Sequence, residues 1–147
     1  MTTAASRSRR SGPAWALMGA LLALAGSADA LRAQSTDETR TTLDGVYTTE
    51  QAERGRETYI QVCAECHVLD WYTGDIVRAW EGAPLYNLFE VISTTMPQNN
   101  PGSLPRRQYV DMLAYILELN GMPPGDAELS TGTSRLRQIL FQWSDGS

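Results

Sequence analysis

The chain has 147 residues, a mass of 16.2 kDa and a formal net charge of −5. This length fits one domain of ordinary size, and two cysteines are too few for a disulfide-dense scaffold. The acidic balance, with a pI near 4.8, excludes a surface for duplex nucleic acid, which would be strongly basic. No stretch reaches the roughly 20 apolar residues of a bilayer span, which excludes a polytopic membrane protein.

Residues 1–30 have the pattern of a secretory signal peptide. Three arginines (Arg7, Arg9 and Arg10) precede the small and apolar run 14–26, and Ala28-Asp29-Ala30 offers an A-x-A cleavage site. An uncleaved membrane anchor is the alternative interpretation of this run. Cleavage leaves 117 residues and removes three arginines and one aspartate, which changes the formal charge from −5 to −7. We therefore expect an exported, periplasmic protein.

The segment 31–45 contains mainly Thr, Ser, Asp and Arg, and this composition predicts a flexible linker ahead of a single domain over residues 46–147. A helix is expected over 48–62, with Thr48 as its N-cap and Gln51 completing a capping box. Gly55, in the middle of this helix, is either a tolerated weakness or a point where another helix approaches closely.

The remaining elements are predicted to be helical. After an irregular stretch (68–84), Leu85, Leu88, Phe89 and Ile92 recur at helical spacing, and this helix ends at Thr94-Thr95-Met96-Pro97. A loop (98–105) leads to the clearest helix (about 105–120), which carries an apolar stripe and ends at Gly121. A last helical piece is expected over 134–141. Because no segment shows strand-like alternation, we expect an all-α fold.

The only two cysteines and the only histidine lie in one string, Cys63-Ala64-Glu65-Cys66-His67. This spacing is typical of covalent haem attachment, in which the two thiols form thioethers with the porphyrin vinyl groups and His67 becomes an axial ligand of the iron. A thioredoxin-like redox pair would need a βαβ setting, and a zinc site would need further nitrogen or sulfur ligands. The sequence contains neither a βαβ pattern nor further cysteine or histidine ligands.

A second axial ligand would have to come from methionine, because the chain has no other histidine. Methionine is the usual partner of histidine in electron-carrying haem proteins, where it raises the reduction potential. Met112 lies on the apolar stripe of the long helix, and Met122 follows that helix beside two prolines. Met96 is the favoured candidate, since it lies in a Pro-bounded loop that can present a sulfur atom.

Three further stretches extend the pattern: Leu88-Phe89-Glu90-Val91-Ile92-Ser93-Thr94-Thr95-Met96-Pro97, Asn100-Pro101-Gly102-Ser103-Leu104, and 115–123, which ends in Asn120-Gly121-Met122-Pro123. With these motifs the chain resembles the class I c-type cytochromes, in particular a monohaem branch associated with periplasmic quinoprotein dehydrogenases. The resemblance implies a small helical domain wrapped around one covalent haem, Met96 as the distal ligand, and a crossing of the first and long helices near Gly55.

Other residues are candidates for contact with the haem. Trp80 and Arg78 are expected to bind the propionates, although core packing and a solvated charge explain them as well. The wall of the crevice, or simply the core, is predicted from seven apolar side chains: Tyr59, Leu85, Leu88, Phe89, Ile92, Leu113 and Ile116. Members of the resembled class often carry a Gly-Pro-x-Leu segment whose carbonyl binds the axial imidazole, and the short stretch 68–79 lacks it.

The sequence thus predicts an electron-transfer protein and not an enzyme. It would carry one electron between a dehydrogenase-type donor and an oxidase or other cytochrome acceptor, with no nucleic acid or small-molecule substrate and with membrane contact only if the signal is uncleaved. Two alternatives stay open. One is a haem enzyme or gas sensor with a displaceable sixth ligand, and the other is a tethered subunit of a larger oxidoreductase.

Overall fold

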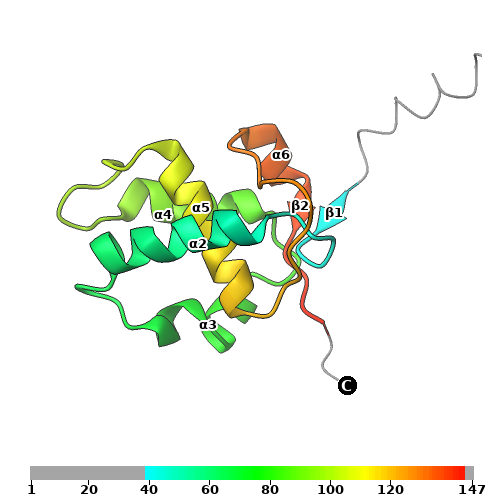
Figure 1. The fold of residues 1–147 in the computed structure, drawn as a ribbon, viewed down its shortest axis with the longest axis horizontal. Coiled ribbons are helices and arrows are strands. Elements are labelled where there is room, and N and C mark those ends of the chain that lie inside the picture. Colours follow the sequence, from blue (N-terminus) through cyan, green and yellow to red (C-terminus); the bar gives the residue numbers. More distant parts are fainter. Residues whose placement is uncertain (1–38, 145–147) are drawn as a thin grey trace, which may run out of the picture. The chain divides into compact units, whose positions relative to one another are not determined.

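The computed structural model describes residues 39–144, so the predicted signal peptide and most of the predicted linker lie outside the described residues. The described chain is mainly helical, which confirms the all-α prediction (Figure 1). The elements in chain order are β1 (Arg40–Thr41), α2 (Thr49–Thr58), the π-helix η1 (Tyr59–Cys63), the 3₁₀-helix η2 (Leu69–Tyr72), α3 (Asp75–Arg78), α4 (Leu85–Thr95), α5 (Arg106–Leu119), α6 (Thr133–Arg137) and β2 (Ile139–Leu140).

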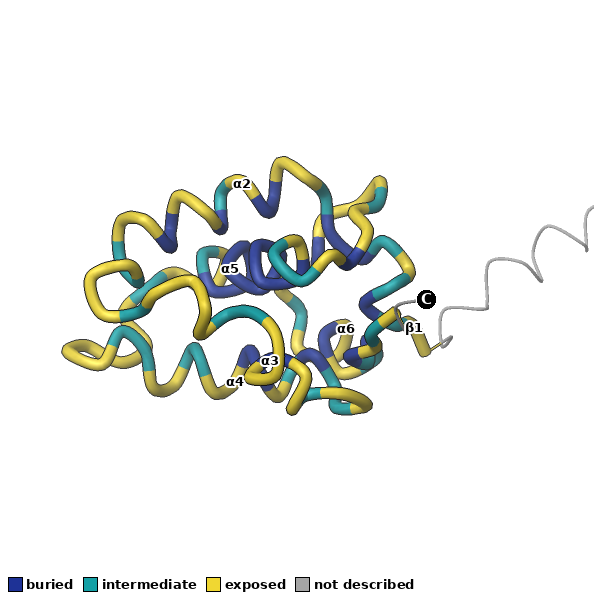
Figure 2. Tube along the Cα trace, turned by 90° about the horizontal axis from the view of Figure 1, so that it is seen from below, coloured by how far each residue is buried: buried dark blue, intermediate teal, exposed yellow. Residues whose placement is uncertain are grey.

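Helix α5 lies at the centre of the core. Every residue from Tyr109 to Leu117 is buried, because α2 packs on one side of α5 and α4 on the other. Figure 2 shows α5 in dark blue between these two helices. The sequence predicted burial of one stripe only, and the difference arises because α5 is covered on more than one side. The buried set includes one charged residue, Asp111.

The crossing of α2 and α5 is closest at Gly55. A Cβ atom on Gly55 would lie 2.0 Å from the carbonyl oxygen of Asp111 and 2.8 Å from Cβ of Tyr115. Only glycine therefore permits this approach of the two backbones. The prediction of close helix contact at Gly55 is confirmed.

The start of α2 agrees only in part with the predicted capping box. The Thr48 hydroxyl accepts a hydrogen bond of 3.2 Å from the N–H of Gln51, as expected of an N-cap. The Gln51 side chain, however, is bound to the backbone of Leu129: its amide donates to the carbonyl (3.0 Å), and its oxygen accepts from the N–H (2.6 Å). The capping-box prediction is therefore wrong for Gln51, because a distant segment uses the side chain.

Helices α4 and α5 begin and end near the proline and glycine residues that predicted their bounds. Pro84 precedes the first residue of α4, and Met96 is the C-cap residue of that helix. Pro105 precedes α5, whose start has no side-chain cap. Gly121, at φ +76°, ends α5, and the N–H groups of Gly121 and Met122 bind the last free carbonyls.

The two ends of the described chain are joined beside α6. β1 and β2 form a parallel pair, and the Thr42 hydroxyl donates to the Gln142 carbonyl (2.7 Å) while accepting from the Gln142 N–H (2.9 Å). The helix predicted over 134–141 is wrong beyond Arg137, because the backbone of 139–140 pairs with β1 instead. Thr42 is fully buried, so packing begins ahead of Val46, within the last residues of the predicted linker.

Over residues 39–144 no helix has the length and apolar character to cross a membrane.

Candidate functional site

The two cysteines and the histidine lie on a single turn at the end of α2. The helix continues as η1, in which the N–H of Ala64 binds the carbonyl of Tyr59, five residues back (2.9 Å). The carbonyl of Cys63 then accepts from the N–H groups of Cys66 (3.1 Å) and His67 (2.9 Å). This folding brings two thiols and one imidazole within one turn of backbone. The widened π turn was not predicted, and turns of this kind are frequent at functional sites.

Both cysteines are free thiols in different surroundings. Cys63 is partly buried and Cys66 is exposed. Burial raises the pKa of the Cys63 thiol, and a hydrogen bond with Tyr72 partly opposes this rise. Burial also raises the pKa of the Tyr72 hydroxyl. At neutral pH both groups are therefore held in their uncharged forms.

The imidazole of His67 is surrounded by aromatic rings. Its ring centroid lies 5.2 Å from that of Trp71 and 5.9 Å from that of Tyr72. Its main-chain carbonyl accepts a hydrogen bond of 2.9 Å from the Tyr59 hydroxyl. Nδ1 is buried without a hydrogen-bond partner among the described residues. A metal would therefore be bound through Nε2, the other ring nitrogen.

Exposed apolar side chains are concentrated in the segment that contains this turn. Within residues 39–144, six large apolar side chains are exposed, and five of them lie between residues 60 and 76: Ile60, Val68, Leu69, Trp71 and Ile76. Exposed apolar groups concentrated in this way mark a surface that another apolar body covers. A porphyrin attached to the two thiols would be such a body. The donor set and its surroundings therefore fit a covalently attached haem.

The three candidate methionines differ clearly in burial. Met112 and Met122 are in the core, with exposures of 2% and 3%. Met96 is only partly buried, and its carbonyl accepts hydrogen bonds from the Tyr109 hydroxyl (2.8 Å) and the Gly102 N–H (3.2 Å). In Figure 1 the segments that follow α2 and α4 both lie at the left side of the ribbon. Met96 as the second ligand therefore stays a prediction.

The two residues proposed for the propionates have other contacts. The Arg78 guanidinium lies 4.4 Å from the ring centroid of Trp143, and its side chain is exposed. Trp80 is partly buried and packs against the core. Of the seven expected wall residues, Ile92 is partly buried, and the other six belong to the core. These contacts leave the roles of Arg78 and Trp80 toward a haem as predictions.

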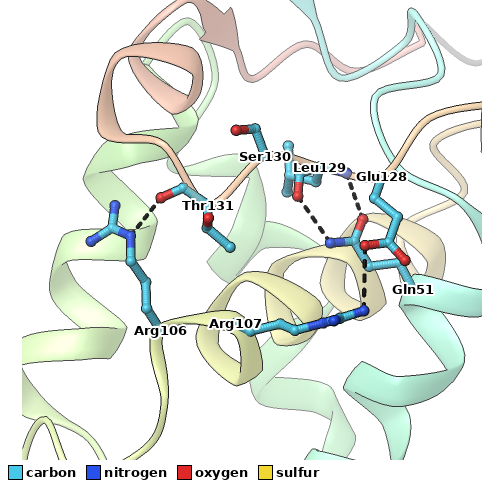
Figure 3. Close-up of a pocket in the computed structure, with 7 residues that line it drawn as sticks. All are labelled: Gln51, Arg106, Arg107, Glu128, Leu129, Ser130 and Thr131. Carbon is cyan, nitrogen blue, oxygen red and sulfur yellow. Dashed lines mark hydrogen bonds and ion pairs between the residues drawn. The ribbon is translucent and has the colours of Figure 1, made fainter.

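A separate pocket of about 620 Å³ lies beside the start of α5 (Figure 3). Its charged groups bind one another or nearby backbone: Arg107 pairs with Glu128 (3.5 Å), and Arg106 donates to the Thr131 carbonyl (2.5 Å). Glu128 also pairs with Arg54, which holds the buried carboxylate of Asp111 through two hydrogen bonds of 3.1 and 3.2 Å. None of the predicted site residues lines this pocket. The ion-pair network was missed by sequence reasoning, since its members are far apart along the chain.

Residues 50–116 match the family model described as cytochrome C oxidase, cbb3-type, subunit III. The matched stretch runs from α2 through most of α5 and includes the Cys63–His67 turn and Met96. This match supports a c-type cytochrome. A domain of this kind implies covalently bound haem c, a role in electron transfer and redox proteins as partners. Searches of curated proteins and of solved structures found no match.

Proposed function

We propose that this cytochrome c domain is an exported monohaem electron carrier that transfers one electron from a periplasmic dehydrogenase-type donor to a respiratory acceptor. The proposal is carried by the Cys63–His67 turn, in which two thiols and an imidazole lie in a segment rich in exposed apolar side chains. Its export is supported by the sequence of residues 1–30, which has the pattern of a signal peptide.

Each residue of the site has a separate task in this proposal. Cys63 and Cys66 would hold the porphyrin by thioether bonds, and His67 and Met96 would bind its iron. Haem c, when bound, supplies an iron that gains and loses one electron. The carbonyl of His67 is held by Tyr59 and that of Met96 by Tyr109, so both ligands are attached to backbone that the core fixes. Fixed ligands on both sides keep rearrangement small when the charge of the site changes.

The proposal is tested by spectroscopy of the protein produced with export and haem-ligation machinery. We expect a reduced-minus-oxidised spectrum of a low-spin c-type haem that does not change rapidly when carbon monoxide is added to the reduced protein. Met96→Ala should open the sixth position and allow carbon monoxide to bind. The matched variant Met112→Leu removes a buried sulfur and should keep the wild-type spectrum. Rapid carbon monoxide binding by the wild type would instead support the haem enzyme or gas sensor.

A second candidate function is that of a subunit within a larger oxidoreductase. It is favoured by the match of residues 50–116 to a family described as an oxidase subunit. The intact mass of the protein isolated from its native membrane or periplasmic fraction separates the two functions. A mass that includes residues 1–30, with stable co-purification of another redox protein, supports the subunit. A mass without these residues and a monomeric protein support the free carrier.

Charge defines the kind of partner that this carrier would bind. After removal of residues 1–30 the formal charge is −7, and all basic side chains are arginine. Opposite charges on two proteins accelerate their association, and added salt screens this attraction. We propose a partner with a positively charged docking site. The rate of electron transfer to a candidate partner should fall as ionic strength rises, and a rate independent of salt for every candidate would contradict this.

A further inference from the structure

The buried Nδ1 of His67 is an unusual feature of the site. Buried nitrogen atoms in proteins are nearly always hydrogen-bonded, and the few exceptions often have a functional reason. If Nε2 binds the iron, as the proposed function requires, Nδ1 carries the proton of the imidazole. Within residues 39–144 this proton has no acceptor. Its surroundings are the rings of Trp71 and Tyr72.

These two rings lie against the imidazole at different inclinations. The plane of Trp71 is tilted by 54° from the imidazole plane, and that of Tyr72 is inclined by 74° in an edge-on contact. Rings at two inclinations restrict rotation of the imidazole about its bond to the backbone. Tyr72 is itself held by an edge-on contact with Tyr59, at 5.6 Å between centroids. Because Tyr59 also binds the His67 carbonyl, backbone and ring of His67 are fixed by the same group of aromatic residues.

Trp71 shows a further sign of a specific role. Its side chain is 57% exposed, although tryptophan is normally well buried. The part of Trp71 that is not exposed includes its contact with His67. The Trp71 ring therefore covers one side of the imidazole.

We propose that Trp71 and Tyr72 are positioning residues for His67, which hold its imidazole plane by aromatic packing and keep its Nδ1 proton away from any hydrogen-bond acceptor. A hydrogen bond from this proton to an acceptor raises the basicity of a metal-bound histidine. Without one, the imidazole donates less electron density and stabilises ferric iron less. The aromatic cover thus holds the reduction potential above the value that the same ligands would give with a bonded Nδ1.

The decisive variants change Trp71 alone. Trp71→Leu removes the cover and lets water accept the Nδ1 proton, so the reduction potential should shift to lower values, and this proton should exchange faster with solvent. Trp71→Phe retains a ring and should stay close to the wild type in both measurements. Trp143→Leu is the matched control, because Trp143 contacts Arg78 and not His67. The proposal is overturned if Trp71→Leu keeps the potential of the control, or if Trp71→Phe shifts as far as Trp71→Leu.

A measurement on the wild type keeps the test independent of whether a variant folds. In the reduced, nitrogen-15-labelled holoprotein, the Nδ1 proton of His67 should resonate where an imidazole N–H without a hydrogen bond is found. A strongly downfield resonance, typical of a carbonyl-bound N–H, would overturn the inference even if Trp71→Leu fails to mature. The inference rests on the proposed function, but the two can fail separately. A wild type without haem contradicts the function, whereas a haem-loaded wild type with a bonded Nδ1 contradicts the inference alone.

Discussion

The backbone of Gly55 lies so close to that of Asp111 that a Cβ atom on Gly55 would sit 2.0 Å from the Asp111 carbonyl oxygen. No real Cβ atom approaches a backbone oxygen this closely, so the two helices would have to separate. Gly55→Ala should therefore lower the free energy of unfolding by about 2–4 kcal/mol, as overpacking against rigid backbone does. Denaturant unfolding of the holoprotein measures this change.

Gly132→Ala is the control for that experiment. Gly132 has φ −74°, which any residue adopts, and an added Cβ would meet only the side chains of Ser130 (3.3 Å) and Arg135 (3.9 Å). Its unfolding free energy should change by less than about 1 kcal/mol. Equal losses in the two alanine variants would show that the α2–α5 crossing does not need a glycine.

The buried carboxylate of Asp111 depends on Arg54. The Asp111 side chain is 4% exposed, and besides its bonds from Arg54 it faces only the more distant Arg107 (3.7 Å). Arg54→Met leaves a buried carboxylate poorly paired and should destabilise the fold by about 2–4 kcal/mol. Arg56→Met removes a solvent-exposed pair with Glu53 and should leave the stability close to that of the wild type. Thermal or denaturant unfolding measures both variants. Equal stability losses in the two would contradict a special role of the Arg54–Asp111 pair.

The Tyr109 hydroxyl ties the Met96 loop to α5. It donates to the Met96 carbonyl (2.8 Å) and accepts from the Leu104 N–H (3.3 Å). Tyr109→Phe should cost about 1 kcal/mol of stability and loosen this loop. If Met96 is the distal ligand, added cyanide should replace it faster in this variant. Tyr86→Phe, which loses a surface bond to Glu90, should leave the rate unchanged. If cyanide replaces the ligand at an unchanged rate in Tyr109→Phe, the Tyr109 hydrogen bond does not hold Met96 in place.

Stability at alkaline pH should depend on Tyr47. Its hydroxyl is buried and donates to the Met122 carbonyl (2.7 Å), and burial raises its pKa from 10.0 to about 12. A pKa raised by folding means that Tyr47 stabilises the fold fully below pH 10 and loses this contribution as the pH rises through about 12. Tyr47→Phe should be less stable by about 1 kcal/mol at neutral pH but should lose stability less steeply above pH 10. Guanidinium unfolding across this pH range measures both effects.

Local signals in the sequence predicted the features that depend on neighbouring residues. The proline before α4, the glycine that ends α5 and the string from Cys63 to His67 each act within a few positions of the chain. The close approach at Gly55 was also predicted. A glycine inside a helix lowers the stability of that helix, so its presence there indicates that another backbone passes close by. The helical class of the fold followed from these patterns.

Features that depend on distant segments could not be predicted. The Gln51 side chain binds Leu129 across the fold, and residues 139–140 pair with 40–41 at the other end of the described chain. The contact of Trp71 and Tyr72 with His67 was missed for a related reason. Aromatic residues soon after Cys66-His67 are visible in the sequence, but their orientation toward the imidazole depends on contacts between η2 and η1, such as that of Tyr72 with Tyr59.

The most direct test of the central claim is whether haem stays on the unfolded chain. The protein should be exported with haem-ligation machinery, denatured, extracted with acid-acetone and weighed by mass spectrometry. We predict that the pigment remains with the polypeptide, that the mass exceeds that of the chain by one haem, and that Cys63→Ala together with Cys66→Ala abolishes both. A colourless wild-type chain with the mass of the polypeptide alone would contradict the account.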